Sequence, residues 1–216
     1  KFVLGLSATP ARQDGMHPIM FMQCGDIAYE SKKEIKKIHT LKTIVSTFEA
    51  LSDDFSLILN EMVEDFDRNN LIISEIEKLK NRNILVLSER IEHLNILYHI
   101  LDAKKIKSTL IHGGLKSKMK KEFLKEANSS SIILSTSSFI GEGIDFSHLD
   151  AIILTMPVSY WGRIVQYLGR IGRDGQECIA IDFYDENTPM LRSSFQKRQK
   201  GYKKMGYISL NEKGLF

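Results

Sequence analysis

The chain has few cysteines and no long apolar run. Only Cys24 and Cys178 occur among its 216 residues; they are far apart and follow no metal-ligand spacing. We therefore expect neither a disulfide framework nor a metal site, and this usage indicates a reducing, cytoplasmic compartment. No apolar segment approaches the roughly 20 residues needed to span a bilayer, and no secretory signal pattern is present. No membrane association is expected.

Neither sign of charge is in large excess. The 30 Lys and Arg residues nearly balance the 27 Asp and Glu residues, which leaves a net charge of +3. The protein is therefore not surrounded by positive potential, and any nucleic-acid contact must come from local patches. The hydrophobic content of 43% and charged content of 26% are typical of an ordinary globular protein. The length predicts between one and two domains.

Two signatures of a nucleotide-hydrolysing enzyme are missing. The chain contains no Gly-Lys dipeptide, so it has no Gly-x-x-x-x-Gly-Lys-Ser/Thr phosphate loop. Asp185 and Glu186 follow an apolar run and imitate a magnesium-binding acidic pair, but they come too late in the chain, so we interpret them as a polar turn. The chain opens on Lys-Phe-Val-Leu-Gly-Leu, which resembles the middle of a strand. We therefore expect a piece of a longer protein.

From Asn83 onward, short apolar runs alternate with amphipathic segments. The runs predict strands, and the amphipathic segments predict helices of about 10 to 15 residues, a pattern typical of βαβ units and a parallel sheet with right-handed crossovers. We expect an α/β, doubly wound domain with its functional groups at the carboxyl ends of the strands. The expected strands are 84–87, 108–111, 132–135, 151–155 and 178–183, and the expected helices are 92–101, 117–127 and 160–173.

The chain before Asn83 is less regular. Segment 38–48 has the alternation of a strand, and 55–66 and 71–79 have helical spacing, interrupted between them by 67–70. We interpret these helices as a packed helical hairpin. The predicted organisation has four parts: 1–34, the end of one domain and a connector; 35–82, a bridging strand and helices; 83–187, the main domain; and 188–216, a basic helical tail.

Small polar residues follow each predicted strand of the main domain. Taken singly, each is better explained as a helix cap or a turn, and His112 alone is more often a packed or capping histidine than a catalyst. It is improbable that all of them would fall on one sheet edge by chance. The residues in question are Ser88, Glu89 and Arg90 after the first strand, His112, Gly113 and Gly114 after the second, and Thr136 and Ser137 after the third.

Segment 166–175 carries closely spaced arginines and glycines. If it is helical, Gln166, Arg170 and Arg173 share one face. Gly169 and Gly172 cost helix stability, which indicates that something approaches that face closely. Two guanidinium groups beside bare backbone suit a polyanion such as a triphosphate. The alternative is an exposed basic helix end.

Segment 166–175 resembles the last conserved motif of superfamily 2 helicases of the DEAD/DEAH type, Gln-x-x-Gly-Arg-x-x-Arg. Segment 136–145 resembles their fifth motif, Thr-x-x-x-x-x-Gly-x-Asp, and 4–15, with its Ser-Ala-Thr, resembles their third motif as found in the restriction-subunit-like and XPB-like branches. The signals at 88–90 and 112–113 lie between them in the family's order. The resemblance implies a RecA-like C-terminal domain of a P-loop NTPase-like helicase, preceded by the end of a first RecA-like domain.

The resemblance also implies site roles. Arg173 is expected to act as an arginine finger with Arg170, while Gln166 senses the γ-phosphate or the attacking water. Ser7 and Thr9 are expected to couple ATP state to nucleic-acid grip, and ATP and Mg²⁺ are expected to be held mainly by the upstream domain. The further expected ATP contacts are Gly143 and Asp145, and the expected nucleic-acid contacts are Ser88, Arg90, His112, Gly113, Thr136 and Ser137.

The resemblance implies an ATP-hydrolysing helicase or translocase acting on nucleic acid, with DNA preferred because the form of segment 4–15 resembles DNA-acting branches. The isolated chain is expected to be inactive. A nuclease or modification partner is possible in such families. The alternative is a non-catalytic RecA-like binding or interaction module. The basic tail either packs back on the domain with a solvated face or contacts nucleic-acid backbone.

Overall fold

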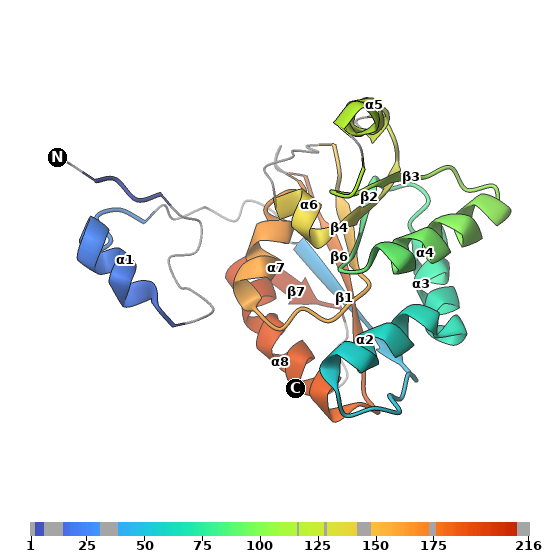
Figure 1. Cartoon of the computed structure of the whole chain (residues 1–216), viewed down its shortest axis with the longest axis horizontal. Helices are drawn as coiled ribbons and strands as arrows, with labels where there is room; N and C mark the ends of the chain where they lie inside the picture. Colours follow the sequence, from blue (N-terminus) through green and yellow to red (C-terminus); the bar gives the residue numbers. More distant parts are fainter. Residues whose placement is uncertain are drawn as a thin grey trace.

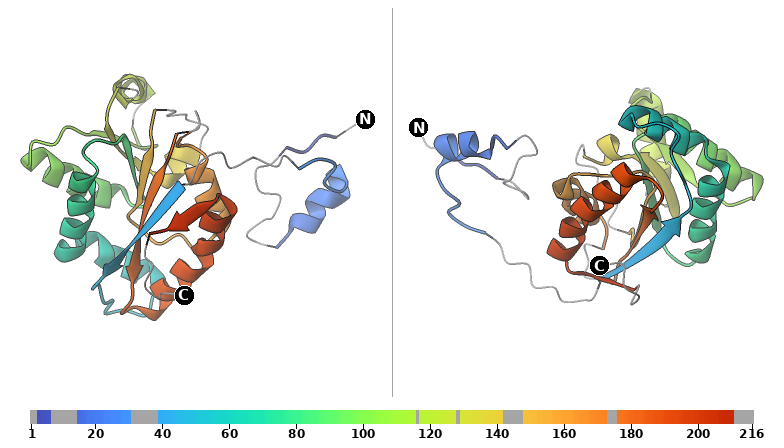
Figure 2. Two further views of the ribbon diagram at one scale, coloured as in Figure 1. Left: turned by 180° about the vertical axis from the view of Figure 1, so that it is seen from behind. Right: turned by 90° about the horizontal axis from the view of Figure 1, so that it is seen from below.

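The computed structural model describes residues 3–6, 15–30, 39–115, 117–127, 129–141, 148–172 and 176–210. Most of them build a parallel sheet covered on both faces by helices (Figures 1 and 2). In the described residues the sheet has seven strands in the order β3-β4-β2-β5-β6-β1-β7, and every pair of neighbouring strands is parallel. The predicted α/β, RecA-like doubly wound fold is confirmed.

The strands at the centre of the sheet are its most apolar segments. All residues of β2 (Ile84–Ser88), β4 (Ile132–Thr136) and β5 (Ala151–Leu154) are buried. Continuous apolar runs are expected where helices cover both faces of a parallel sheet. The other strands are β1 (His39–Ser46), β3 (Thr109–Ile111), β6 (Ile179–Asp185) and β7 (Tyr207–Ser209).

Helices on the two faces enclose separate apolar clusters. One cluster joins the sheet to α6 (Ser137–Gly141), α7 (Trp161–Leu168) and α8 (Pro189–Lys204), with α5 (Ser117–Ala127) packed against it. The opposite cluster joins it to α3 (Phe66–Lys78) and α4 (Ile91–Ala103). A third, smaller cluster lies under α2 (Phe55–Glu64). The helices of the first two clusters thus bury their apolar stripes against the sheet, while α2 packs against α3 and α4.

The first described residues lie apart from this body. Helix α1 (His17–Cys24) and residues 3–6 are separated from the sheet in Figures 1 and 2, and the Cys24 side chain lies next to the Gly5 backbone. We expected only a connector after the end of a domain here; Pro18 stands at the start of the helix, where proline is tolerated. The domain boundaries themselves stay a prediction, although β1, placed in the bridging segment, pairs with β6 and β7 inside the sheet.

Two helix boundaries differ from the expectation. The break between α2 and α3 falls at Asp65, not at 67–70, because the Asp65 carboxylate accepts from the backbone N–H of Arg68 and caps α3. Helix α7 ends at Leu168 rather than at residue 173. The short elements α6 and β7 were not anticipated. No helix in the described part of the chain is long and apolar enough to cross a membrane.

Candidate functional site

Three predicted strand ends lie side by side on one sheet edge. Ser88 pairs in register with Thr136, the last residue of β4. Ile111 of β3 pairs with Ser135 of β4, so the next residues of the two strands, His112 and Thr136, lie beside each other. The order β3-β4-β2 therefore brings His112, Thr136 and Ser88 into one row at the carboxyl edge. This is where open α/β sheets bind ligands.

Arg90 and His112 each have a buried side-chain nitrogen that the described part of the chain leaves unpartnered. Arg90 precedes the first turn of α4 and its Nε finds no hydrogen-bond partner there, and neither does His112 Nδ1. Beside His112, Gly113 is exposed, and a side chain added at it would meet no atom within 4 Å. A buried polar nitrogen without a partner calls for an explanation, and an anion that enters beside the open Gly113 backbone is one.

The Ser88 hydroxyl, in contrast, serves the interior. It accepts from the backbone N–H of Arg90 at 3.1 Å and lies 3.2 Å from Nδ1 of His93, and the residue is 1% exposed. We expected Ser88 to contact nucleic acid; the structure gives its hydroxyl an internal role in holding the turn before α4. Sequence reasoning missed His93, whose i+5 spacing from Ser88 is not a recognised signal.

A polar relay continues from His93 into α3. Asn69 donates through Nδ2 to the Val63 carbonyl, so its Oδ1 is the acceptor for His93 Nε2 at 2.8 Å. His93 Nδ1 is then left to accept from the Ser88 hydroxyl. Burial, together with the nearby Arg68 charge, lowers the pKa of His93 to about 3. The ring is therefore neutral at ordinary pH, and its two hydrogen bonds connect the 88–90 turn to α3.

Thr136 and Ser137 are also nearly buried. The Ser138 hydroxyl donates to Thr136 Oγ1 at 3.4 Å, and Ser137 lies against the Tyr167 phenol where α6 packs on α7. Burial raises the pKa of Tyr167, so this phenol remains a neutral partner. Tyr167 belongs to α7 and Ser137 starts α6, so the end of β4 is tied to the helix that precedes the predicted arginines.

Gln166 and Arg170 do not share one helical face. Gln166 is exposed on α7, but Arg170 lies in the turn beyond the helix, where its N–H bonds the Tyr167 carbonyl at 3.0 Å. Gly172 has a φ of +61°, and an added Cβ would lie 1.9 Å from the Cys178 sulfur. Close internal packing and a left-handed backbone therefore explain this glycine, rather than the approach of a ligand as we expected.

An ion pair joins α7 to the turn after β2. Arg163 Nη1 lies 3.0 Å from Glu89 Oε1, with side-chain exposures of 49% and 30%. Such a partly solvated pair adds little to stability. Its importance is geometric, since it is a second link, besides Tyr167–Ser137, between α7 and the carboxyl edge of the sheet.

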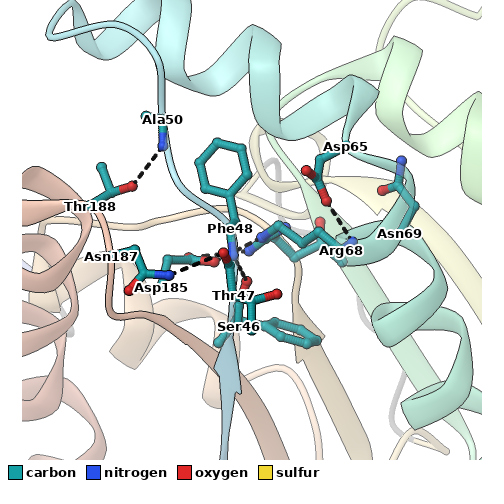
Figure 3. A network of polar contacts seen from close by, with 12 residues as sticks. Ser46, Thr47, Phe48, Ala50, Asp65, Arg68, Asn69, Asp185, Asn187 and Thr188 are labelled. Carbon is teal, nitrogen blue, oxygen red and sulfur yellow. Dashed lines mark hydrogen bonds and ion pairs between the residues drawn. The ribbon is translucent and has the colours of Figure 1, made fainter.

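A buried ion pair lies at the neighbouring end of β6 (Figure 3). Arg68 Nε lies 3.0 Å from Asp185, and Arg68 Nη1 donates to the Thr155 carbonyl at 2.7 Å. Close by, the Asn187 amide donates to the Thr47 carbonyl and the Ala50 N–H to Thr188 Oγ1. Asp185 is thus an internal anchor for α3, not the polar turn that we expected.

Some predicted residues lie outside the described part of the chain. They are Ser7, Thr9, Gly143, Asp145 and Arg173. Among the described residues, no group of three or more His, Cys, Asp or Glu side chains is arranged to hold a metal ion.

Comparison with known sequences gives a consistent picture. The family model described as "Helicase conserved C-terminal domain" matches residues 67–175. The protein named "Putative helicase 161L" of Invertebrate iridescent virus 6 is 27% identical over 243 residues, which cover 99% of this chain and 52% of the relative. The protein named "Putative ATP-dependent RNA helicase QP509L" of African swine fever virus is 28% identical over 245 residues, covering 95% and 46%. The chain thus spans about half the length of these relatives.

Solved structures share the fold at low sequence identity. The structure of S. cerevisiae Dbp5 bound to RNA and ADP BeF3 superposes with a TM-score of 0.63 at 15% identity, covering 95% of this chain and 51% of that one. T4 UvsW gives the same TM-score and identity, covering 79% and 40%. At such identities the likeness is one of fold.

Proposed function

Because this chain belongs to the family of helicase conserved C-terminal domains, we propose that it is the second motor domain of an ATP-dependent superfamily 2 helicase or translocase. Relatives that carry this domain are named ATP-dependent RNA helicases, and the chain spans about half of each. The whole protein would close two RecA-like domains on ATP, and closing and opening would move a nucleic-acid strand stepwise.

The observation that carries this proposal is the double link between α7 and the sheet edge. Arg163–Glu89 and Tyr167–Ser137 join the helix that leads to Arg170 and Arg173 to the turns that follow β2 and β4. A shift of α7 on ATP closure would therefore reposition both turns. An isolated binding module would have no need of such mechanical continuity between two sites.

On the nucleotide side, the proposal assigns Arg173 as the arginine finger and Arg170 as its neighbour on the triphosphate. Gln166, which is exposed on α7, would sense the γ-phosphate or the attacking water. Gly143 and Asp145 would lie near the ATP sugar. Mg²⁺ and most ATP contacts would come from the upstream domain. An arginine finger raises the rate of nucleotide hydrolysis by a factor of roughly 10³–10⁵.

On the nucleic-acid side, Arg90, His112 and the backbone N–H of Gly113 would hold strand phosphates. The open backbone at Gly113 supports this choice, and the buried Arg90 Nε and His112 Nδ1 would gain partners if these two side chains turn towards the strand. Thr136 and Ser137 are too buried to reach a strand without movement, so in this proposal they position the turn. Contacts to phosphate carry no sequence information, and the affinity should fall steeply with salt.

The strand type separates two versions of the proposal. DNA is favoured by the resemblance of segment 4–15 to DNA-acting branches, whereas the relatives' names favour RNA. Matched single-stranded DNA and RNA of one sequence, tested as activators of ATP hydrolysis by the full-length protein, decide between them. A nuclease or modification partner stays a prediction.

A pair of variants in the full-length protein tests the division of roles. Arg173→Ala is expected to abolish ATP hydrolysis while ATP and strand binding stay nearly intact. Arg90→Ala is expected to weaken strand binding while leaving hydrolysis without nucleic acid unchanged. Lys80→Ala, at an exposed position away from both, is the control. Hydrolysis within threefold of the parent in Arg173→Ala would remove the finger assignment.

The isolated chain provides a second test. Without the phosphate loop it should hydrolyse no ATP, and robust turnover by the purified 216 residues would refute the proposal. The alternative, a non-catalytic RecA-like interaction module, predicts that the full-length protein binds nucleic acid without any nucleic-acid-stimulated hydrolysis.

A further inference from the structure

All the charged residues on the exposed side of helix α8 are cations. Every charged residue between Pro189 and Lys204 is a Lys or an Arg, and all except Arg198 are exposed. This concentration stands out in a chain whose net charge is only +3. The exposed cations are Arg192, Lys197, Lys200, Lys203 and Lys204, and we call this set the α8 basic face.

The buried side of α8 fixes the basic face in place. Arg198 bonds both oxygens of Asp182, at 2.6 and 2.9 Å, and the Tyr202 hydroxyl donates to the same carboxylate at 3.0 Å. At Gly201 the helix touches α7 so closely that an added Cβ would lie 2.7 Å from the Ile164 Cβ. The orientation of the outer face is therefore set by the core, and no ordering of the helix is needed on binding.

Trp161, the only tryptophan of the chain, lies beside two of these cations. The Lys200 and Lys204 Nζ atoms stand 5.2 and 4.9 Å from the centroid of its ring. The ring attracts both ammonium groups through its quadrupole. Two lysines that would otherwise sample many rotamers are thereby gathered at one place, next to the start of α7.

Helix stability does not explain the whole face. Lys203 and Lys204 lie in the last turn, where cations favour the helix dipole. Arg192 lies near the first turn, where a cation is unfavourable, and Lys197 and Lys200 lie between. Like charges spaced three or four residues apart, such as Lys200 and Lys204, each cost a few tenths of a kcal/mol. In the described part of the chain, none of the exposed cations of α8 has a carboxylate partner.

We infer that the α8 basic face is a second docking surface for nucleic-acid backbone, in addition to the contacts proposed for Arg90 and His112. The inference rests on the proposed function, which brings a strand to this domain. Because ammonium groups stand over the Trp161 ring, phosphates rather than stacked bases are the natural ligands, so binding is sequence-neutral. A membrane does not fit, since the apolar side of α8 is already buried in the core and cannot enter a lipid interface.

The intrinsic fluorescence of Trp161 allows a direct test. The full chain is titrated with a 20-nucleotide single strand at several salt concentrations, following both Trp161 emission and the anisotropy of a label on the strand. The variant Lys200→Gln/Lys204→Gln removes two exposed charges from the face. The matched control, Lys80→Gln/Lys107→Gln, removes two exposed charges from elsewhere on the surface. Arg90→Gln reports on the contacts proposed at the carboxyl edge of the sheet.

The α8 variant is expected to bind about tenfold more weakly at 0.1 M salt and to lower the salt slope by about 1.4, because each lost phosphate contact to a single strand removes about 0.7. The emission change should disappear. The control should leave the slope unchanged. If the α8 variant loses no more affinity for the strand than the control does, the inference is overturned. If Arg90→Gln still weakens binding in that case, the proposed function stands without it.

Two further ligands complete the test. Poly-glutamate of similar charge and vesicles containing anionic lipid are titrated under the same conditions. If either matches the strand in affinity and in dependence on Lys200 and Lys204, the surface is a general anion site or serves another partner, and the inference fails. If no strand binds to the full chain at all, the inference fails as well.

Discussion

Acid should destabilise this protein through one buried histidine. His93 is enclosed between α3 and β2, with both ring nitrogens in hydrogen bonds. Burial and the Arg68 charge lower its pKa from 6.5 to about 3. Between pH 6.5 and pH 3 this histidine is protonated in the unfolded chain but stays neutral in the folded chain. The stabilisation from the neutral ring is therefore complete above pH 6.5 and is lost progressively as pH falls towards 3.

The magnitude follows from the shift. One pKa unit corresponds to about 1.4 kcal/mol, so His93 should account for a loss of about 2 kcal/mol between pH 7 and pH 5. Other groups also titrate over this range, so the effect must be isolated by substitution. His93→Gln removes the titrating ring and keeps an amide that can donate to Asn69.

The assay is urea unfolding of the full chain, followed by circular dichroism at pH 7 and pH 5. His93→Gln should be less stable than the parent at pH 7, because a buried network is disturbed, and should lose about 2 kcal/mol less on acidification. His99→Gln, at an exposed position on the same helix, is the control. If the parent and His93→Gln lose stability equally to within about 0.5 kcal/mol, the reasoning is wrong.

Three further predictions follow from named contacts. Arg198→Met should lower the free energy of unfolding in urea by about 3–5 kcal/mol, because Asp182 stays buried without its charged partner. Adding Asp182→Asn should restore part of this stability, and a loss below about 1 kcal/mol in Arg198→Met contradicts the prediction. Gly201→Val should cost about 1–3 kcal/mol by forcing α8 from α7, whereas Gly113→Ala should be nearly neutral. Glu89→Gln should change stability by under about 1 kcal/mol but reduce nucleic-acid stimulation of hydrolysis in the full-length protein; unchanged stimulation removes the proposed coupling.

Much of the fold could be read from the sequence because it depends on local pattern. The runs in β2, β4 and β5 are apolar throughout, which a buried parallel strand requires, and the amphipathic segments between them match α4 and α5. The short β7 escaped prediction because a strand of this length is specified by its pairing with β1 rather than by its own residues.

The candidate site was predicted less completely. Arg90 and His112 lie at the predicted edge, each with a buried nitrogen that has no partner among the described residues, and their contact with a ligand stays a prediction. Ser88 occupies the same edge, but its hydroxyl turns inward to His93. Nothing local distinguishes these cases, because whether a side chain at a strand end faces solvent depends on which helix packs behind it.

By itself, the sequence determined the order of strands and helices, the parallel sheet that this order requires, and the set of polar residues at the strand ends. Those features depend on periodicity and chain direction, which any segment carries alone. Tertiary structure decided which polar groups pair with one another. Arg68 and Asp185 are separated by 117 residues, and Arg163 and Glu89 by 74. Such pairs exist only because the sheet order brings distant strand ends together, so packing alone determines whether a charge anchors the core or faces a ligand.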